Sequence, residues 1–184
     1  TFQYEVGKEL NLSRISAPLY VTQSSGLNDN LNGTEKPVSF TMKELPGEQM
    51  EVVHSLAKWK RMALKKYGFK LHEGLYTNMN AIRKDEELDN FHSAYVDQWD
   101  WEKIISKNER TKETLVEHVR TIFKVIKHME HEVWYKYPQA VNHLPDDIFF
   151  ITTQELLDMY PNMNAKEREN AITKEHGCVF VMQI

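Results

Sequence analysis

Apolar residues recur every three or four positions along the segment from Thr111 to Lys136. This spacing places them on one side of an α-helix, so the segment is predicted to be a long helix with a single apolar stripe. Shorter stretches with the same periodicity predict further helices at residues 2–10, 55–67, 154–159 and 165–175. In the 55–67 helix we expect Ser55 to be the N-cap and Gly68 to end the helix.

Two other segments alternate between apolar and polar residues, which is the pattern of a half-buried strand. They are residues 75–83 and 91–101, and the charged stretch 84–90 between them has the character of a turn. We therefore expect a long antiparallel hairpin. Shorter strands are expected at residues 15–21, 38–44, 51–54, 147–151 and 178–184, with a loop at 23–37. Hairpins combined with separate helices predict an α+β fold, an antiparallel sheet flanked by helices.

The composition excludes several classes of protein. With 184 residues, 41% of them hydrophobic and 27% charged, the chain is globular rather than disordered. A formal net charge of -4 argues against binding to a nucleic-acid backbone, which requires clustered positive charge. No apolar stretch reaches the ~20 residues that cross a bilayer. The single cysteine, Cys178, lies in an apolar run, so we expect a buried thiol and a cytoplasmic protein.

Four segments together carry a resemblance to a known family. They read Asp-Asn-Leu-Asn-Gly-Thr-Glu-Lys at 29–36, Glu-Val-Val-His-Ser-Leu-Ala-Lys-Trp-Lys-Arg at 51–61, Glu-Gly-Leu-Tyr-Thr at 73–77 and His-Ser-Ala-Tyr-Val-Asp-Gln-Trp-Asp-Trp-Glu at 92–102. The chain resembles the ammonia-using asparagine synthetases, or aspartate–ammonia ligases, over essentially its whole length. The second and fourth segments are the most specific.

The resemblance implies the catalytic core of a class II aminoacyl-tRNA synthetase. Motif 1 would lie around Pro18 and motif 2 from Leu75 to Trp101, and the family implies a homodimer formed through motif 1. The glycine-rich motif 3 of this family would follow Ile184. We therefore expect residues 1–184 to be a single catalytic domain that ends before motif 3.

The implied reaction is the ATP-dependent amidation of L-aspartate by ammonia, through a β-aspartyl adenylate, to L-asparagine, AMP and pyrophosphate. Arg83 would grip the reacting carboxylate and the α-phosphate with its planar fork. Lys60 follows Ser55 by five residues, a spacing similar to that in aspartyl-tRNA synthetases, and would pair with a substrate carboxylate. Asp29 would bind ammonium and accept a proton. Without the resemblance, these three residues are interpreted as a surface ion pair, a solvated basic helix face and a turn residue.

The remaining expected contacts come from the second hairpin strand and its surroundings. Gln98 and Asp100 share one side of that strand and would accept hydrogen bonds from the α-ammonium of aspartate, with Ser55 adding a hydroxyl. Ser93 and Val96 would contact the adenosine. Mg2+ is expected only together with ATP, and no residue of this chain is assigned to a metal. His128 and His131 have a spacing that a metal could use, but a solvent-facing helix surface is the preferred interpretation.

Two alternatives stay open from the sequence alone. One is an aspartyl- or asparaginyl-tRNA synthetase core, which pyrophosphate exchange with and without tRNA would separate from an ammonia ligase. The other is a non-catalytic paralogue or fragment that binds an amino acid without turnover. A glycine-rich segment encoded after Ile184 would favour the enzyme.

Overall fold

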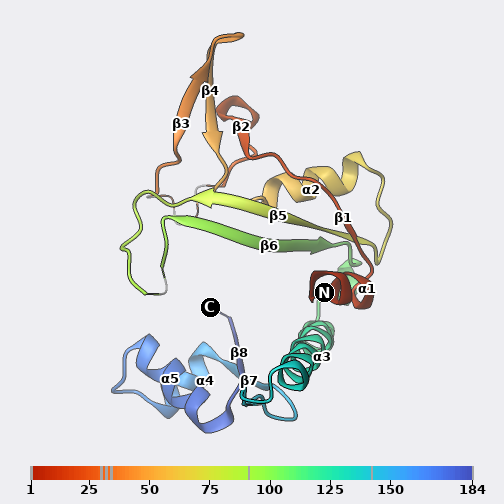
Figure 1. The fold of residues 1–184 in the computed structure, drawn as a ribbon, viewed down its shortest axis with the longest axis vertical. Helices are drawn as coiled ribbons and strands as arrows, with labels where there is room; N and C mark the ends of the chain where they lie inside the picture. Colours follow the sequence, from red (N-terminus) through yellow and green to blue (C-terminus); the bar gives the residue numbers. More distant parts are fainter. Residues whose placement is uncertain are drawn as a thin grey trace. The chain divides into compact units, whose positions relative to one another are not determined.

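The computed structural model describes residues 2–29, 31, 33, 35–90, 92–141 and 143–183 (Figure 1). These residues divide into two compact units, one formed by Gly7–Lys107 and the other by Thr1–Val6 together with Asn108–Ile184. Some positions used in the predictions lie outside the described residues, namely Asn30, Asn32 and Thr34 of the 29–36 segment, Phe91 of the hairpin and Ile184 of the last strand.

The predicted long hairpin is confirmed, and it lies in the first of these units (Figure 1). β5 (Gly74–Ile82) runs antiparallel to β6 (Tyr95–Lys103). The backbone N–H of Arg83 donates to the carbonyl of Ala94 at 2.7 Å, which extends the pairing beyond the strand ends. β1 (Leu12–Arg14) pairs in parallel with the other edge of β5.

α2 (Ala57–Lys66) covers one face of this hairpin. The two elements share a buried cluster, to which they contribute Trp59, Ala63, Leu64, Leu75, Met79 and Ala81. The helix begins later than predicted, because Leu56 rather than Ser55 is its N-cap. The Ser55 hydroxyl nevertheless accepts a hydrogen bond from the N–H of Ala57 at 3.2 Å. Gly68 follows the helix at φ +73°, as its predicted stop requires.

The single strand predicted at residues 15–21 is wrong in extent. The chain leaves the first sheet after Ile15, whose N–H donates to the Tyr76 carbonyl at 2.9 Å, and enters a second sheet as β2 (Tyr20–Thr22). Pro18 lies in the gap, where it has no N–H to give to a ladder. One predicted strand is therefore two short ones in different sheets.

The second sheet is antiparallel and has the order β2-β4-β3. β3 (Ser39–Met42) confirms the strand expected at 38–44, while β4 (Leu45–Val52) starts well before the expected 51–54. Residues 45–50 do not alternate in polarity, so their strand conformation comes from pairing with β3, joined by β2 only from Met50 onward. The loop expected at 23–37 contains one short helical turn, η1 (Gln23–Ser25).

The other unit confirms the predicted long helix. α3 (Lys112–Lys136) begins after Thr111, whose side chain accepts a hydrogen bond from the N–H of Thr114. β7 (Phe149–Thr152) and β8 (Val179–Met182) form a parallel pair. The remaining elements are α1 (Phe2–Glu9), η2 (Lys107–Glu109), α4 (Thr153–Met159) and α5 (Ala165–His176).

The α+β class is confirmed, although the pairs β1–β5 and β7–β8 are parallel rather than antiparallel. Cys178 packs against a buried cluster of α3 and β7 neighbours that includes Phe123 and Ile148. Cys178 is half-buried rather than fully buried as expected; desolvation raises the pKa of its thiol, which makes the reactive thiolate scarcer.

Candidate active site

The register of the central hairpin places the predicted aspartate-binding residues on the face that α2 covers. Met79 lies opposite Gln98, and Thr77 lies opposite Asp100. Directly opposed residues of an antiparallel pair point to the same side of the sheet. Since Met79 belongs to the cluster shared with α2, Gln98 and Asp100 point toward this helix as well.

Lys60 of α2 meets this face as a buried cation. Its Nζ lies 2.5 Å from Oδ2 of Asp100 and 3.9 Å from Oε1 of Glu102, and donates to the Trp101 carbonyl at 3.4 Å. Only 1% of Lys60 is exposed, so the solvated-face interpretation is wrong for this residue. A buried ammonium needs such compensation. The other basic residues of the patch are exposed, as expected: Lys58, Arg61, Lys65 and Lys66.

The Asp100 side chain is 39% exposed, in contrast to its partner. Its Oδ1 accepts a hydrogen bond from the N–H of Trp101 at 2.9 Å while Oδ2 faces Lys60. The carboxylate is thus held at both oxygens and still reachable from solvent. On the opposite face of the hairpin, the ring of Trp99 lies 5.6 Å from that of Tyr76, as the alternation predicts.

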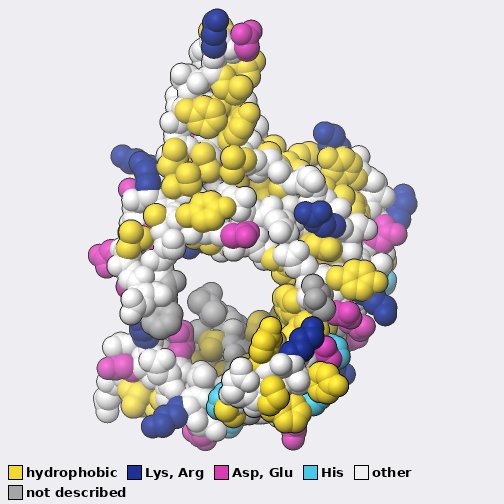
Figure 2. All heavy atoms as spheres, viewed as in Figure 1, with side chains coloured by type: hydrophobic (Ala, Val, Ile, Leu, Met, Phe, Trp, Pro, Cys, Tyr) yellow, Lys and Arg dark blue, Asp and Glu magenta, His cyan; other side chains and the backbone are white. Residues whose placement is uncertain are grey.

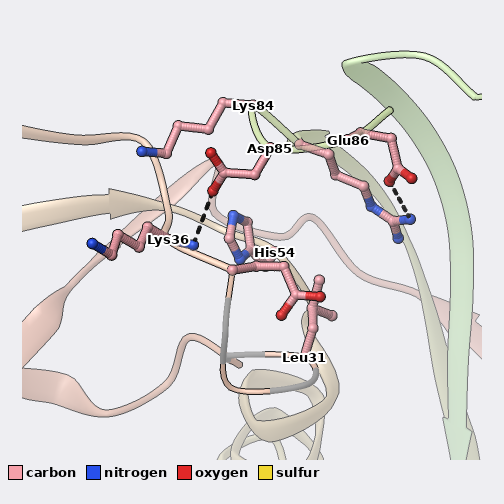
Figure 3. Close-up of a pocket in the computed structure, with 8 residues that line it drawn as sticks. Leu31, Lys36, His54, Lys84, Asp85 and Glu86 are labelled. Atoms are coloured by element: carbon pink, nitrogen blue, oxygen red, sulfur yellow. Dashed lines mark hydrogen bonds and ion pairs between the residues drawn. The ribbon is translucent and has the colours of Figure 1, made fainter. Parts of the chain in front are cut away.

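Arg83 lies at the turn end of the hairpin and lines a cavity of about 540 Å³ (Figure 3). Its Nη1 is 3.7 Å from Oε2 of Glu86, a long ion pair, and its buried Nε has no hydrogen-bond partner among the described residues. The guanidinium is therefore only loosely engaged. The other residues that line the cavity are Leu31, Glu35, Lys36, His54, Lys84, Asp85 and Glu86.

A buried asparagine that the sequence did not single out organises the loop around Asp29. Asn28 Oδ1 accepts hydrogen bonds from the N–H groups of His54 at 2.9 Å and Asp29 at 3.1 Å, and its Nδ2 donates to Glu51 at 3.0 Å. Lys58 Nζ donates to the Asn28 carbonyl at 3.2 Å. The loop is thus tied to the end of β4 and the start of α2. Asp29 is half-buried.

The predicted residues form two groups rather than one. Lys60, Gln98 and Asp100 lie along the middle of the hairpin, whereas Arg83 lies at its end. Thr77 lies opposite Asp100, and Ile82 directly precedes Arg83. These two residues of β5 are five positions apart, a distance of about 17 Å along a strand. Neither Lys60 nor Asp100 lines the described Arg83 cavity.

Three further predicted residues lie around these groups. Ser55 is half-buried and directly follows His54 in the chain. Val96 is half-buried and lies opposite Ala81. Ser93 is exposed, and its hydroxyl accepts a hydrogen bond from the N–H of Tyr95 at 3.3 Å.

The described part of the chain offers neither a metal centre of clustered side chains nor a helix suited to a membrane. No group of three His, Cys, Asp or Glu side chains there is arranged to hold a metal ion. The ring of His131 on α3 lies 5.5 Å from that of Trp134. Of the helices described, none is long and apolar enough to cross a membrane.

The model of the aspartate–ammonia ligase family matches residues 1–184. The aspartate–ammonia ligase of Lactiplantibacillus plantarum is 76% identical over 184 residues, which is 100% of this chain and 57% of that protein. The enzyme of the same name from Ligilactobacillus salivarius is 77% identical over 185 residues, covering 100% of this chain and 55% of the relative. The chain therefore spans about half the length of the curated relatives it matches.

Solved structures of much lower identity share the fold. Asparaginyl-tRNA synthetase from Pyrococcus horikoshii, complexed with asparaginyl-adenylate, matches with a TM-score of 0.67 at 11% identity, over 98% of this chain and 42% of that one. The asparaginyl-tRNA synthetase of Entamoeba histolytica with the same ligand matches with a TM-score of 0.65 at 12% identity, over 100% and 42% of the two chains. The expected class II synthetase fold is thereby confirmed.

Proposed function

This chain belongs to the aspartate–ammonia ligase family, and from that premise we propose that the complete protein converts L-aspartate, ATP and ammonia into L-asparagine, AMP and pyrophosphate. In the first step an oxygen of the aspartate β-carboxylate bonds to the α-phosphorus and pyrophosphate leaves. In the second step ammonia attacks the acyl carbon of this adenylate, loses protons, and AMP leaves.

The observation that carries the proposal is the ion pair of Lys60 with Asp100, beside Gln98, on the hairpin face under α2. Aspartate brings two carboxylates and one ammonium, so its pocket needs both a cation and acceptors. Lys60 supplies a cation whose position is fixed by burial, and Asp100 and Gln98 supply acceptors for the α-ammonium. The hydroxyl of Ser55 is a further group for the same ligand.

Arg83 is proposed to hold the reacting carboxylate and the α-phosphate together. A guanidinium presents a planar fork of donors that matches both groups, and positioning of this kind accounts for much of the rate of acyl activation. Because its ion pair with Glu86 is long, at 3.7 Å, Arg83 can turn to a ligand at little cost. Ser93 and Val96 are proposed to contact the adenosine, and Mg2+ enters bound to ATP as part of the substrate.

Asp29 is proposed to act in the second step. A carboxylate attracts ammonium and can then accept a proton as the amine attacks. The hydrogen bond from the Asp29 N–H to Asn28 anchors the backbone beside this carboxylate, and no described residue forms a hydrogen bond or ion pair with the carboxylate itself.

The complete protein is further proposed to be a cytoplasmic homodimer that pairs through the segment around Pro18. Figure 2 shows hydrophobic side chains gathered over the projecting β2-β4-β3 sheet, and Leu19, Tyr20, Phe40 and Leu45 are exposed there. The rings of Tyr20 and Phe40 meet edge to face, with centroids 5.1 Å apart. Exposed apolar surface of this kind is typical of interfaces.

The test is aspartate-dependent exchange of labelled pyrophosphate into ATP by the complete protein, followed by a search for asparagine when ammonia is added. We expect exchange without tRNA and asparagine in the presence of ammonia. Exchange followed by acylation of added tRNA, with no free asparagine, would instead identify a tRNA synthetase. Binding of aspartate without any exchange would identify a non-catalytic amino-acid-binding protein.

A further inference from the structure

His54 is buried at the cavity that Arg83 also lines, and its ring has no hydrogen-bond partner among the described residues. It follows β4 and precedes α2, and its backbone N–H is fixed by the 2.9 Å hydrogen bond to Asn28 Oδ1. Only 2% of the residue is exposed, and among the described residues neither Nδ1 nor Nε2 has a hydrogen-bond partner. A buried imidazole in this condition loses its water contacts without replacement, so it calls for an explanation.

The His54 ring lines the Arg83 cavity (Figure 3). The Arg83 Nε is also buried without a hydrogen-bond partner among the described residues. Two nitrogen groups at one cavity therefore lack acceptors. An imidazole donates from at least one ring nitrogen, and the Nε–H of arginine only donates. The ligand that satisfies both groups must bring oxygen acceptors.

Three cations and three carboxylates line this cavity, and the cations can meet the phosphate groups of a nucleotide. Lys36 and Lys84 line it together with Arg83. The carboxylates are those of Glu35, Asp85 and Glu86; Asp85 accepts a hydrogen bond from the Lys36 N–H at 3.3 Å, and Glu86 pairs with Arg83. The groups proposed to read aspartate, Lys60 and Asp100, do not line the cavity as described.

We propose that His54 is a substrate-contacting residue whose imidazole donates a hydrogen bond to a phosphate oxygen of the nucleotide, beside Arg83. This role rests on the proposed function, because it assumes that Arg83 meets the phosphates of ATP. The hydrogen bond that the His54 N–H donates to Asn28 Oδ1 then holds the backbone that carries this imidazole.

The test is calorimetric titration of the complete protein with ATP, inorganic triphosphate and L-aspartate, each alone. His54→Ala should weaken ATP and inorganic triphosphate roughly tenfold or more, as loss of a hydrogen bond to a charged group does. Aspartate affinity should change less than about twofold. His54→Gln, which keeps a donor, should recover part of the loss, and His128→Ala, an exposed histidine of α3, should change nothing.

Unchanged triphosphate affinity in a folded His54→Ala variant would overturn this role, and so would equal weakening of aspartate and ATP. If the variant fails to fold, the contact is tested in the wild-type protein by NMR of the imidazole nitrogens. The chemical shifts of the His54 nitrogens should change when triphosphate is added. An absence of any shift contradicts the contact. If triphosphate binds through His54 but the protein shows no ATP–pyrophosphate exchange, the proposed reaction is contradicted. The proposed contact of His54 with phosphate would still hold.

Discussion

Lys60 and Asp100 form an unequal ion pair, in which the ammonium is almost fully buried and the carboxylate, 2.5 Å away, is 39% exposed. Removal of the Asp100 carboxylate leaves the buried ammonium of Lys60 without its main partner. Removal of the ammonium leaves a carboxylate that water can reach. Substitution of Asp100 and substitution of Lys60 are therefore expected to change the stability of the protein by different amounts.

Asp100→Asn should destabilise the complete protein by about 1–3 kcal/mol, because Lys60 keeps only the Trp101 carbonyl and the more distant Glu102. Lys60→Met should cost less, since the aliphatic stem stays packed and no buried charge remains. Urea unfolding of both variants measures the difference. A larger loss for Lys60→Met would mean that the ammonium is not the group that needs compensation.

Lys60→Met should nevertheless weaken aspartate, by roughly tenfold or more, because a substrate carboxylate loses its charged partner. The affinity for ATP should stay close to that of the wild type. Lys65→Met is a matched control, because it removes an exposed lysine from the same helix. Titration with aspartate and with ATP checks the claim, which fails if the two variants bind aspartate equally well.

Arg83→Lys should reduce aspartate-dependent ATP–pyrophosphate exchange by about 100-fold or more while leaving the fold intact, because a point charge cannot replace the planar fork. The stability should change little, since among the described residues Arg83 forms an ion pair with Glu86 alone, and that pair is long at 3.7 Å. Exchange assays and thermal melts on the same sample measure both effects. Exchange near the wild-type rate would show that Arg83 does not take part in adenylate formation.

Asn28→Ala should destabilise the protein by about 1–3 kcal/mol, because the His54 N–H and the buried Glu51 each lose a partner. It should also slow asparagine formation, since the anchor beside Asp29 is lost. Asn80→Ala, at an exposed position of β5, is the control and should change neither property. Unfolding curves that match between the two variants would contradict the organising role of Asn28.

Asp29→Asn should separate the two steps, because the amide keeps the shape of the side chain but neither attracts ammonium nor accepts a proton. Pyrophosphate should still be released in a single turnover, while asparagine appears about 100-fold or more slowly. A quench-flow experiment that follows both products measures this. Equal loss of pyrophosphate and asparagine would place Asp29 in the first step instead.

The sequence predicts the features that follow from a periodic pattern of apolar and polar residues, or from residues that are near one another in the chain. Alternation alone places Gln98 and Asp100 on one face and Trp99 on the other, and the register of β5 and β6 confirms this division. The apolar spacing of α3 is local in the same way. Local patterns are sufficient here because each strand or helix buries one face.

The features that the sequence missed depend on contacts between distant segments. The spacing from Ser55 and the family resemblance single out Lys60, but its burial and its ion pair depend on Asp100 of β6, 40 positions later in the chain. Asn28 gains its significance only from Glu51 of β4 and from His54, which follows that strand. The division of the 15–21 segment around Pro18 likewise follows from which sheet each part joins.

The central claim is that aspartate is activated as an adenylate before ammonia attacks. In that mechanism one oxygen of the aspartate β-carboxylate stays with the phosphorus when AMP leaves. The complete protein should therefore be given aspartate labelled with heavy oxygen in its β-carboxylate, together with ATP and ammonia, and the AMP examined by mass spectrometry. We expect one labelled oxygen in each AMP formed, and unlabelled AMP alongside asparagine would contradict the account.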